Sequence, residues 1–238
     1  MVARGCGGLE LTSPVPFSAA RTSDFSAAVD LVHARHPKSQ LFVMGFSLGS
    51  SLTLKYMADY ADTTPVMGAL AICPPWDFTC PYTYTFQFFW TFLLANLLKA
   101  WAFPHMWQLG RKNLKLFLAP TMYCFDNMIA PLHGFKDVNE YYVASSPVRV
   151  MHRIQKPTLV LSAVDDPVCN VNGCPTDTSR WVLLLSQLPW EYFWFSFLLP
   201  CVVIKIVHSC QIWPWIDRCD CWARRPLVIC REFFCVSM

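Results

Sequence analysis

The sequence predicts an α/β protein whose core is a parallel β-sheet, and three observations support this prediction. Short apolar runs bounded by turn residues, typical of buried strands, cover residues 41–44, 66–73 and 158–163. Segments with apolar residues at helical spacing lie between these runs, and such alternation is typical of parallel strands with helices on both faces of the sheet. Hydrophobic residues make up 54% of the 238 positions, which is enough for one large core.

The first predicted helix covers residues 25–35. Its apolar residues, among them Val29 and Val32, recur at helical spacing. Residues 22–24 (Thr-Ser-Asp) form a suitable N-cap, and Pro37 ends the helix.

The strand at residues 41–44 leads into Gly-Phe-Ser-Leu-Gly, residues 45–49, and a helix is predicted over residues 50–57. A G-x-S-x-G motif between a strand and a helix is the context of a nucleophile elbow, so Ser47 is the candidate nucleophile. The N–H of Leu48, at the start of the helix, can donate to an oxyanion. The alternative is a chance match to the motif in a loop of small residues.

Residues 76–120 are strongly apolar and aromatic. Asn96 and Lys99 interrupt the run before it reaches the roughly 20 apolar residues that a membrane span needs. We expect helices that form a cap over an apolar pocket, within an insertion at about residues 76–147. One long core helix fits the same pattern.

Two acidic residues, Asp165 and Asp166, follow the predicted strand at residues 158–163. The carboxyl ends of parallel strands are where active sites of α/β proteins gather, so this pair supplies a candidate catalytic acid. The alternative is a turn before Pro167 in which a carboxylate binds the following backbone.

Several short motifs, taken in order along residues 4–175, resemble one family: the α/β-hydrolase-fold proteins of the YheT-like branch, which includes the mammalian ABHD1, ABHD2 and ABHD3 group. The resemblance implies an α/β-hydrolase-like sheet with a helical cap insertion, incomplete at both ends of this chain. The motifs are Arg4-Gly5-Cys6-Gly7-Gly8, Leu11-Thr12-Ser13-Pro14, Gly45-Phe46-Ser47-Leu48-Gly49, Phe125-Asp126, His133-Gly134-Phe135, Tyr141-Tyr142, Ser146-Pro147 and Ser162-Ala163-Val164-Asp165-Asp166-Pro167.

Members of this family are esterases, lipases or phospholipases that act on acyl lipids, commonly in association with membranes. The resemblance therefore implies a serine carboxylic-ester hydrolase with an acyl-lipid or ester substrate, no cofactor and no metal. It implies Ser47 as the nucleophile and Asp166 as the acid, with Asp165 as the adjacent alternative. A membrane surface at the cytosolic face is the implied partner.

The chain departs from the family pattern where a Gly-Gly-His motif is expected, because residues 193–199 contain neither glycine nor histidine. His208 is the one histidine beyond the acid pair, and its surroundings do not match the motif. The upstream loop that completes the oxyanion hole in the family is also missing. A serine without a base is a poor nucleophile, so we expect impaired activity. The alternatives are a catalytically inactive, truncated family member and a membrane-associated binding protein.

Composition divides the chain near residue 180. Residues 181–238 hold six of the twelve Cys and six of the ten Trp but none of the nine Gly. We expect a partial hydrolase domain over residues 1–180, followed by a divergent apolar tail that is either a translated non-coding stretch or a membrane anchor. A net charge of +3 without a basic run argues against nucleic acid, and mostly free thiols are expected.

Overall fold

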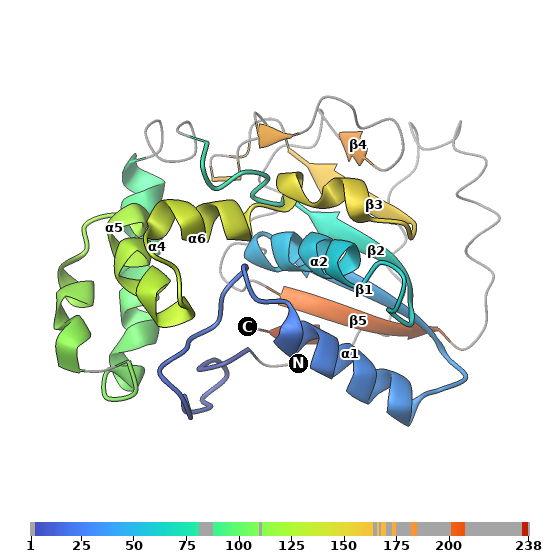
Figure 1. Cartoon of the computed structure of the whole chain (residues 1–238), viewed down its shortest axis with the longest axis horizontal. Helices are drawn as coiled ribbons and strands as arrows, with labels where there is room; N and C mark the ends of the chain where they lie inside the picture. The colour runs from blue at the N-terminus through green and yellow to red at the C-terminus, as the bar shows by residue number, and fades with distance from the viewer. Residues whose placement is uncertain are drawn as a thin grey trace.

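The computed structural model describes residues 3–80, 88–109, 111–163, 166, 168–169, 173–174, 182–184, 201–207 and 235–237. One six-stranded sheet forms its centre, and a group of helices lies beside one end of the sheet (Figure 1). The elements, in chain order, are α1 (Ser23–Arg35), β1 (Gln40–Phe46), α2 (Leu48–Asp59), β2 (Val66–Ile72), α4 (Phe88–Ala102), η1 (Phe103–His105), η2 (Arg111–Leu118), α5 (Met122–Ile129), η3 (Ala130–His133), α6 (Val138–Ser145), η4 (Pro147–Arg149), η5 (Met151–Arg153), β3 (Thr158–Ser162), β4 (Val182–Leu184), β5 (Cys201–Val207) and β6 (Cys235–Ser237).

The strands lie in the order β4-β3-β2-β1-β5-β6. From β1 to β4 every neighbouring pair is parallel, which confirms the predicted α/β sheet. A parallel pair requires a long crossover connection, and α2 supplies it between β1 and β2. The helices from α4 to α6 lie in the longer connection between β2 and β3.

The other side of β1 carries a strand that the sequence did not predict. β5 pairs with β1 in the antiparallel sense, with Val43 opposite Ile204, and β6 pairs with β5 in the same sense. A free strand edge presents unpaired N–H and C=O groups, and β5 satisfies them along most of β1. The sheet is therefore mixed. Its parallel part contains the three predicted strands, β1, β2 and β3, together with β4, which the sequence did not predict, and its antiparallel edge comes from residues beyond 200.

The main hydrophobic core lies between the sheet and the two helices α1 and α2 (Figure 1). Alternate residues of β1, Leu41 and Val43, are almost fully buried on this face. Phe25 and Val29 of α1 pack against them, at the spacing that predicted the helix. The helix begins where expected, although Thr22 does not cap it; its hydroxyl donates instead to Asp59.

The helices α4, α5 and α6 gather beside the sheet and form the cap (Figure 1). α4 ends at Ala102 and is followed by 3₁₀ turns, so the segment is a set of separate helices and not one long core helix. The cap has its own core, in which Leu116, Phe125 and Ile129 are buried. No helix within the described residues is both long enough and apolar enough to cross a bilayer.

Candidate active site

Ser47 lies at a sharp bend between the end of β1 and the start of α2. Its backbone has φ 47° and ψ −121°, a conformation that non-glycine residues rarely adopt. The Ser47 N–H donates to the carbonyl oxygen of Ile72 at 2.9 Å, and the Ser47 carbonyl accepts from the N–H of Ser50 at 3.0 Å. The bend predicted from the G-x-S-x-G motif is therefore present, and neighbouring elements hold its strained backbone on both sides.

Gly45 makes this bend sterically possible. A Cβ at residue 45 would lie against the carbonyl oxygen of Gly49 and 2.5 Å from Thr53 Oγ1. Thr53 Oγ1 in turn donates to the Gly49 carbonyl oxygen, at 2.9 Å. β1 and α2 approach each other so closely that no side chain fits between them.

Asp166 lies just beyond the carboxyl end of β3 and is only 6% exposed. Its Oδ1 accepts hydrogen bonds from the N–H groups of Val168 and Cys169, both at 2.8 Å. This is the turn considered as the alternative to a catalytic role, and it directs the following residues back toward β1. Asp165 lies outside the described residues.

Cys169 contacts both candidate residues, and the sequence did not indicate these contacts. Its Sγ lies 3.8 Å from Ser47 Oγ, while its N–H binds the Asp166 carboxylate. The structure thus brings Ser47 and Asp166 into one neighbourhood through a single intervening residue. A turn centred on Asp166 is the one sequence feature that could have placed Cys169 there.

The Cys169 thiol is buried, and burial raises its pKa well above the ordinary value. The negative charge of Asp166 and the nearby Cys73 raise it further, while the contact with Ser47 has a smaller opposite effect. A thiol with a raised pKa keeps its proton at neutral pH, so it cannot accept the proton of Ser47.

Among the described residues, no histidine forms a hydrogen bond with Ser47 Oγ. His33 lies on α1, His36 is its C-cap, and His152 is in η5. His105 binds the Gly5 carbonyl oxygen, and His133 stacks on a tyrosine ring. His208 and residues 193–199, where the family motif was expected, lie outside the described residues.

The N–H of Leu48 is in the first turn of α2, where backbone N–H groups lack acceptors within the helix. It follows Ser47 directly and is therefore positioned to donate to an oxyanion formed on that serine. The side chain of Leu48 packs against a buried cluster that includes Ala130 and Tyr141 of the cap. The cap thus contacts the candidate site at this residue.

A buried polar network connects the motifs of the cap. Asp126 accepts a hydrogen bond from the Tyr142 hydroxyl at 2.9 Å, and Ser18 donates to the Tyr141 hydroxyl oxygen at 3.2 Å. Burial raises the pKa of Asp126 to about 7, and the hydrogen bond from Tyr142 has a smaller lowering effect.

The His133 ring stacks on the ring of Tyr141. Burial lowers the pKa of His133 to about 4, and the positive charges of Arg21 and Arg4 lower it further by smaller amounts. The sequence resemblance marked these residues but gave no role, and the structure shows that they are packed together.

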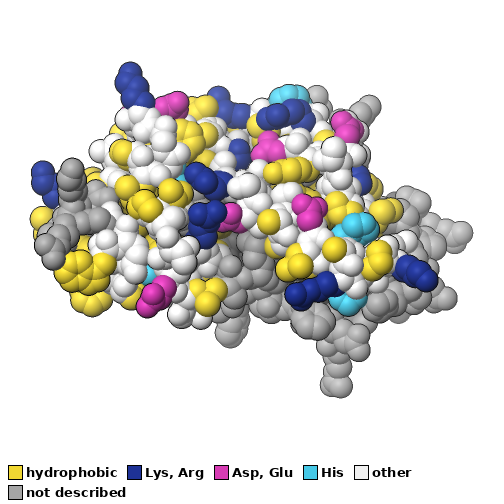
Figure 2. All heavy atoms as spheres, turned by 60° about the horizontal axis from the view of Figure 1, so that its bottom comes forward, with side chains coloured by type: hydrophobic (Ala, Val, Ile, Leu, Met, Phe, Trp, Pro, Cys, Tyr) yellow, Lys and Arg dark blue, Asp and Glu magenta, His cyan; other side chains and the backbone are white. Residues whose placement is uncertain are grey.

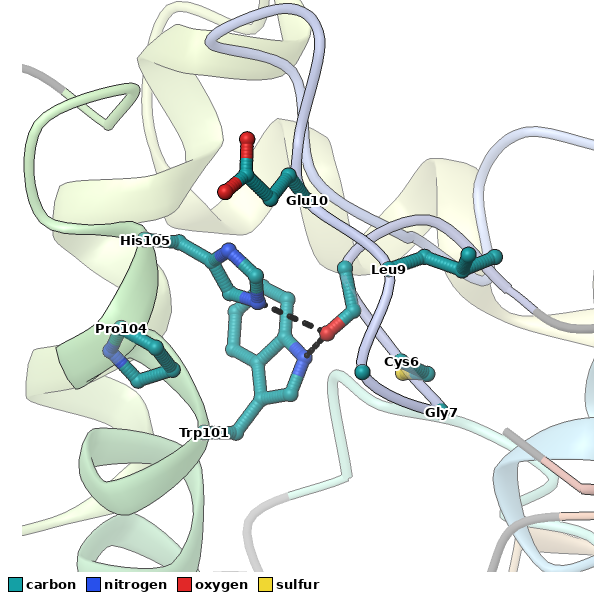
Figure 3. Close-up of a pocket in the computed structure, with 9 residues that line it drawn as sticks. Cys6, Gly7, Leu9, Glu10, Trp101, Pro104 and His105 are labelled. Atoms are coloured by element: carbon teal, nitrogen blue, oxygen red, sulfur yellow. Dashed lines mark hydrogen bonds between the residues drawn. The ribbon is translucent and has the colours of Figure 1, made fainter.

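The glycine-rich turn near the N-terminus forms a separate pocket of about 450 Å³ with η1 and the end of α4. The Gly5 carbonyl oxygen accepts hydrogen bonds from Trp101 Nε1 and His105 Nε2, both at 2.8 Å (Figure 3). Arg4 pairs with Asp24 of α1 through two hydrogen bonds, at 2.5 and 2.7 Å. This turn therefore ties the cap to α1, and neither Ser47 nor Asp166 lines its pocket.

We expect Ser47→Gly to raise the free energy of unfolding by about 1 kcal/mol. Relief of a strained backbone is worth about 1–3 kcal/mol, and the greater entropy of glycine in the unfolded chain offsets about 0.5–1 kcal/mol of it. Urea unfolding measures the change. Ser47→Ala is the matched control because it removes the hydroxyl but keeps the strain. A Ser47→Gly variant that is less stable than Ser47→Ala by about 0.5–1 kcal/mol would show that the bend stores no strain, because only the entropy cost of glycine would then remain.

The chain matches the profile of the family described as serine aminopeptidase, S33 (Hydrolase_4) over residues 4–174, which is more than half of its length. It is 30% identical over 179 residues to human monoacylglycerol lipase ABHD2, covering 67% of this chain and 42% of that protein. It is 29% identical over 194 residues to medium-chain fatty acid ethyl ester synthase/esterase 2 of Saccharomyces cerevisiae, covering 69% and 43%. The chain thus spans less than half the length of these relatives.

Among solved structures, the fold is similar to an esterase from Exiguobacterium antarcticum, with a TM-score of 0.44 and 14% identity over 82% of this chain and 76% of that one. A monoacylglycerol lipase from Paleococcus ferrophilus gives a TM-score of 0.40 and 16% identity over 76% and 75%. The family profile and the ABHD2 relatives agree with the resemblance found in the motifs. The chain therefore belongs to the Hydrolase_4 family of α/β hydrolases, which includes esterases and lipases.

Proposed function

We propose that this chain carries the serine site of a carboxylic-ester hydrolase for acyl lipids, and that its turnover is impaired. The observation that supports the proposal is the strained backbone of Ser47, because such strain is stored at functional sites. Ser47 is the nucleophile, the Leu48 N–H stabilises the oxyanion, and Asp166 is the acid of the site.

In the first step Ser47 Oγ attacks the ester carbonyl carbon. The bond from that carbon to the alcohol oxygen breaks, the alcohol leaves with a proton, and an acyl group remains on Ser47. Water then attacks the acyl group and releases the fatty acid. Both steps need a base for the attacking hydroxyl, and the neighbouring thiol of Cys169 is protonated. Slow turnover follows from this arrangement.

The substrate class is supported by the cap and by the relatives. The cap brings a buried apolar cluster, with Phe78 and Tyr142, against Leu48, next to the nucleophile. Such surroundings suit an acyl chain. The names of the relatives refer to a monoacylglycerol and to fatty acid ethyl esters.

A second candidate is a family member without catalytic activity. It is favoured by the contact of Cys169 Sγ with Ser47 Oγ, because no imidazole of the described residues takes that place. Such a chain would keep the acyl-binding surface and lack turnover.

A fluorophosphonate probe, which reacts with activated serines, separates these candidates. We expect slow labelling of the full chain at Ser47, identified by peptide mapping, and no labelling of Ser47→Ala. Cys169→Ala is the control and should still be labelled, since the reacting atom is the serine oxygen. Without a base, an intact oxyanion hole and substrate binding exceed the reaction in water by roughly 10³–10⁴-fold, and loss of one oxyanion donor removes about 10²–10³ of this. We therefore expect hydrolysis of a soluble p-nitrophenyl ester to exceed the rate in water by only about tenfold. Absence of both labelling and hydrolysis would contradict the proposal and leave the inactive candidate.

A further inference from the structure

The pocket between the glycine-rich turn and the cap contains a buried histidine with one unsatisfied nitrogen. His105 is 6% exposed, and its Nε2 lies 2.8 Å from the carbonyl oxygen of Gly5. A carbonyl oxygen only accepts, so Nε2 carries a proton, and in the neutral ring Nδ1 is then an acceptor. Nδ1 is buried and has no hydrogen-bond partner among the described residues. Leaving a buried acceptor unpaired costs free energy, so this atom favours a ligand that brings a donor.

The neighbours of His105 fix the position of its ring. Trp101 Nε1 donates to the same Gly5 carbonyl oxygen at 2.8 Å. The centroids of the Trp101 and His105 rings are 5.6 Å apart, and the ring planes are tilted by 51°. A Cβ at Gly5 would lie 3.0 Å from Trp101 and 3.1 Å from His105 Nε2, so the turn is packed closely against both rings. Nδ1 is therefore held in place before a ligand binds, which lowers the entropy cost of binding.

Glu10 supplies the charge of the pocket. It is the one charged side chain among the described residues that line the pocket. Figure 3 shows its carboxylate on the side of the His105 ring where Nδ1 lies, away from the contact with Gly5. Glu10 is exposed, and no hydrogen bond or ion pair joins its side chain to another described residue. The side chain can therefore turn outward to admit a ligand and then bind it.

These groups favour an organic cation over a metal ion. The described part of the chain contains no group of three His, Cys, Asp or Glu side chains that could hold a metal. Acidic and basic side chains are interspersed on the face shown in Figure 2, so the selection of a cation depends on Glu10 and not on an extended field of one sign. Leu9, Pro104 and Trp101 add apolar surface to the pocket, and its volume of about 450 Å³ is large enough for a small amine with an apolar body.

We propose that this pocket binds a small amphipathic amine in its ammonium form. One N–H of the ammonium group donates to His105 Nδ1, and a second donates to the Glu10 carboxylate. The apolar body of the ligand packs against Leu9, Pro104 and Trp101. The bound amine links the glycine-rich turn to η1 and the end of α4. The residues of the proposed serine site do not line this pocket, so the inference goes beyond the proposed function.

Isothermal titration calorimetry of the full chain with 2-phenylethylamine near neutral pH tests the proposal. We expect saturable binding at one site, with a Kd of about 1 mM or below, as suits so small a ligand. 2-Phenylethanol lacks the charge and N,N,N-trimethyl-2-phenylethylammonium lacks the N–H donors, so each should bind at least about tenfold more weakly. These comparisons use the unmodified chain and do not depend on the folding of a variant. Ser47→Ala should bind the amine unchanged, which separates this inference from the proposed hydrolase activity.

Two variants test whether the ligand lies in this pocket. His105→Gln keeps a donor for the Gly5 carbonyl oxygen but lacks the ring nitrogen Nδ1, and it should weaken binding of 2-phenylethylamine by about tenfold. Glu10→Gln keeps the shape of the side chain and removes its charge, and it should weaken binding by about fivefold. The matched controls are His36→Gln and Asp62→Asn, both at exposed positions outside the pocket, and they should bind as the unmodified chain does.

Three outcomes would overturn the inference. The first is absence of saturable binding of 2-phenylethylamine by the full chain. The second is a trimethyl compound that binds as tightly as the amine, because donation to His105 Nδ1 would then contribute nothing. The third is an affinity that neither His105→Gln nor Glu10→Gln changes, because the amine would then bind elsewhere on the chain.

Discussion

Replacement of Gly45 by alanine is expected to lower the free energy of unfolding by about 3 kcal/mol or more. The new methyl group would overlap the carbonyl oxygen of Gly49 and lie 2.5 Å from Thr53 Oγ1. Overpacking of a buried site typically costs about 1–3 kcal/mol when side chains can move aside, and here one obstacle is backbone. Urea unfolding monitored by circular dichroism measures the loss.

Gly134→Ala is the matched control for this substitution. Gly134 has φ 87°, so alanine is disfavoured there, but nothing lies within 4 Å of the position of its Cβ. The expected cost is about 1 kcal/mol, which is the price of a left-handed conformation alone. A chain that fails to fold with Gly45→Ala but folds with Gly134→Ala agrees with the close approach of β1 and α2. Similar losses for the two variants would contradict it.

The bend at Ser47 could be predicted because its determinants are local. An apolar strand, two glycines around a serine and a following helix all lie within residues 40–59. The position of Asp166 was predictable for a similar reason, since it follows a recognisable strand directly. Both local predictions agree with where the structure places these residues, while their roles in catalysis stay predictions.

The contacts that the sequence did not reveal are long-range. β5 pairs with β1 across more than 150 residues of sequence, and no pattern in either strand specifies its partner. The contact between Cys169 and Ser47 likewise depends on how the turn after β3 folds back over β1. Propensity and periodicity describe single helices and strands, so they could not predict these long-range contacts.

The buried network in the cap leads to a second prediction, about pH. Asp126 is buried, and its pKa rises from the usual 3.8 to about 7 mainly because burial disfavours the charged form. Between these two values the folded chain keeps a proton that the unfolded chain has lost. Stability from this group is therefore fully present below about pH 4 and is lost as the pH rises to about 7. The difference between the two pKa values corresponds to at most about 4 kcal/mol of unfolding free energy.

Asp126→Asn isolates this effect. Asparagine has nearly the same shape and can still accept the hydrogen bond of Tyr142, but it does not titrate. The variant should gain stability relative to the unmodified chain by up to about 4 kcal/mol between about pH 4 and about pH 8. Urea unfolding of both proteins across this range measures the gain. An exposed control, Asp62→Asn, should leave the pH profile unchanged, and a profile shared by all three proteins would contradict the prediction.

The two proteins have to be compared at each pH because the contribution of His133 to stability changes in the same pH range, in the opposite direction. Its pKa falls to about 4 in the folded chain, so its contribution grows as the pH rises from about 4 to its ordinary value near 6.5. The two contributions partly cancel in the unmodified chain, and its stability alone would show little dependence on pH. Since His133 is present in both proteins, the difference between them reports Asp126. Tyr142→Phe adds an independent check: the lost hydrogen bond had lowered the pKa of Asp126, so the fall in stability should extend to higher pH.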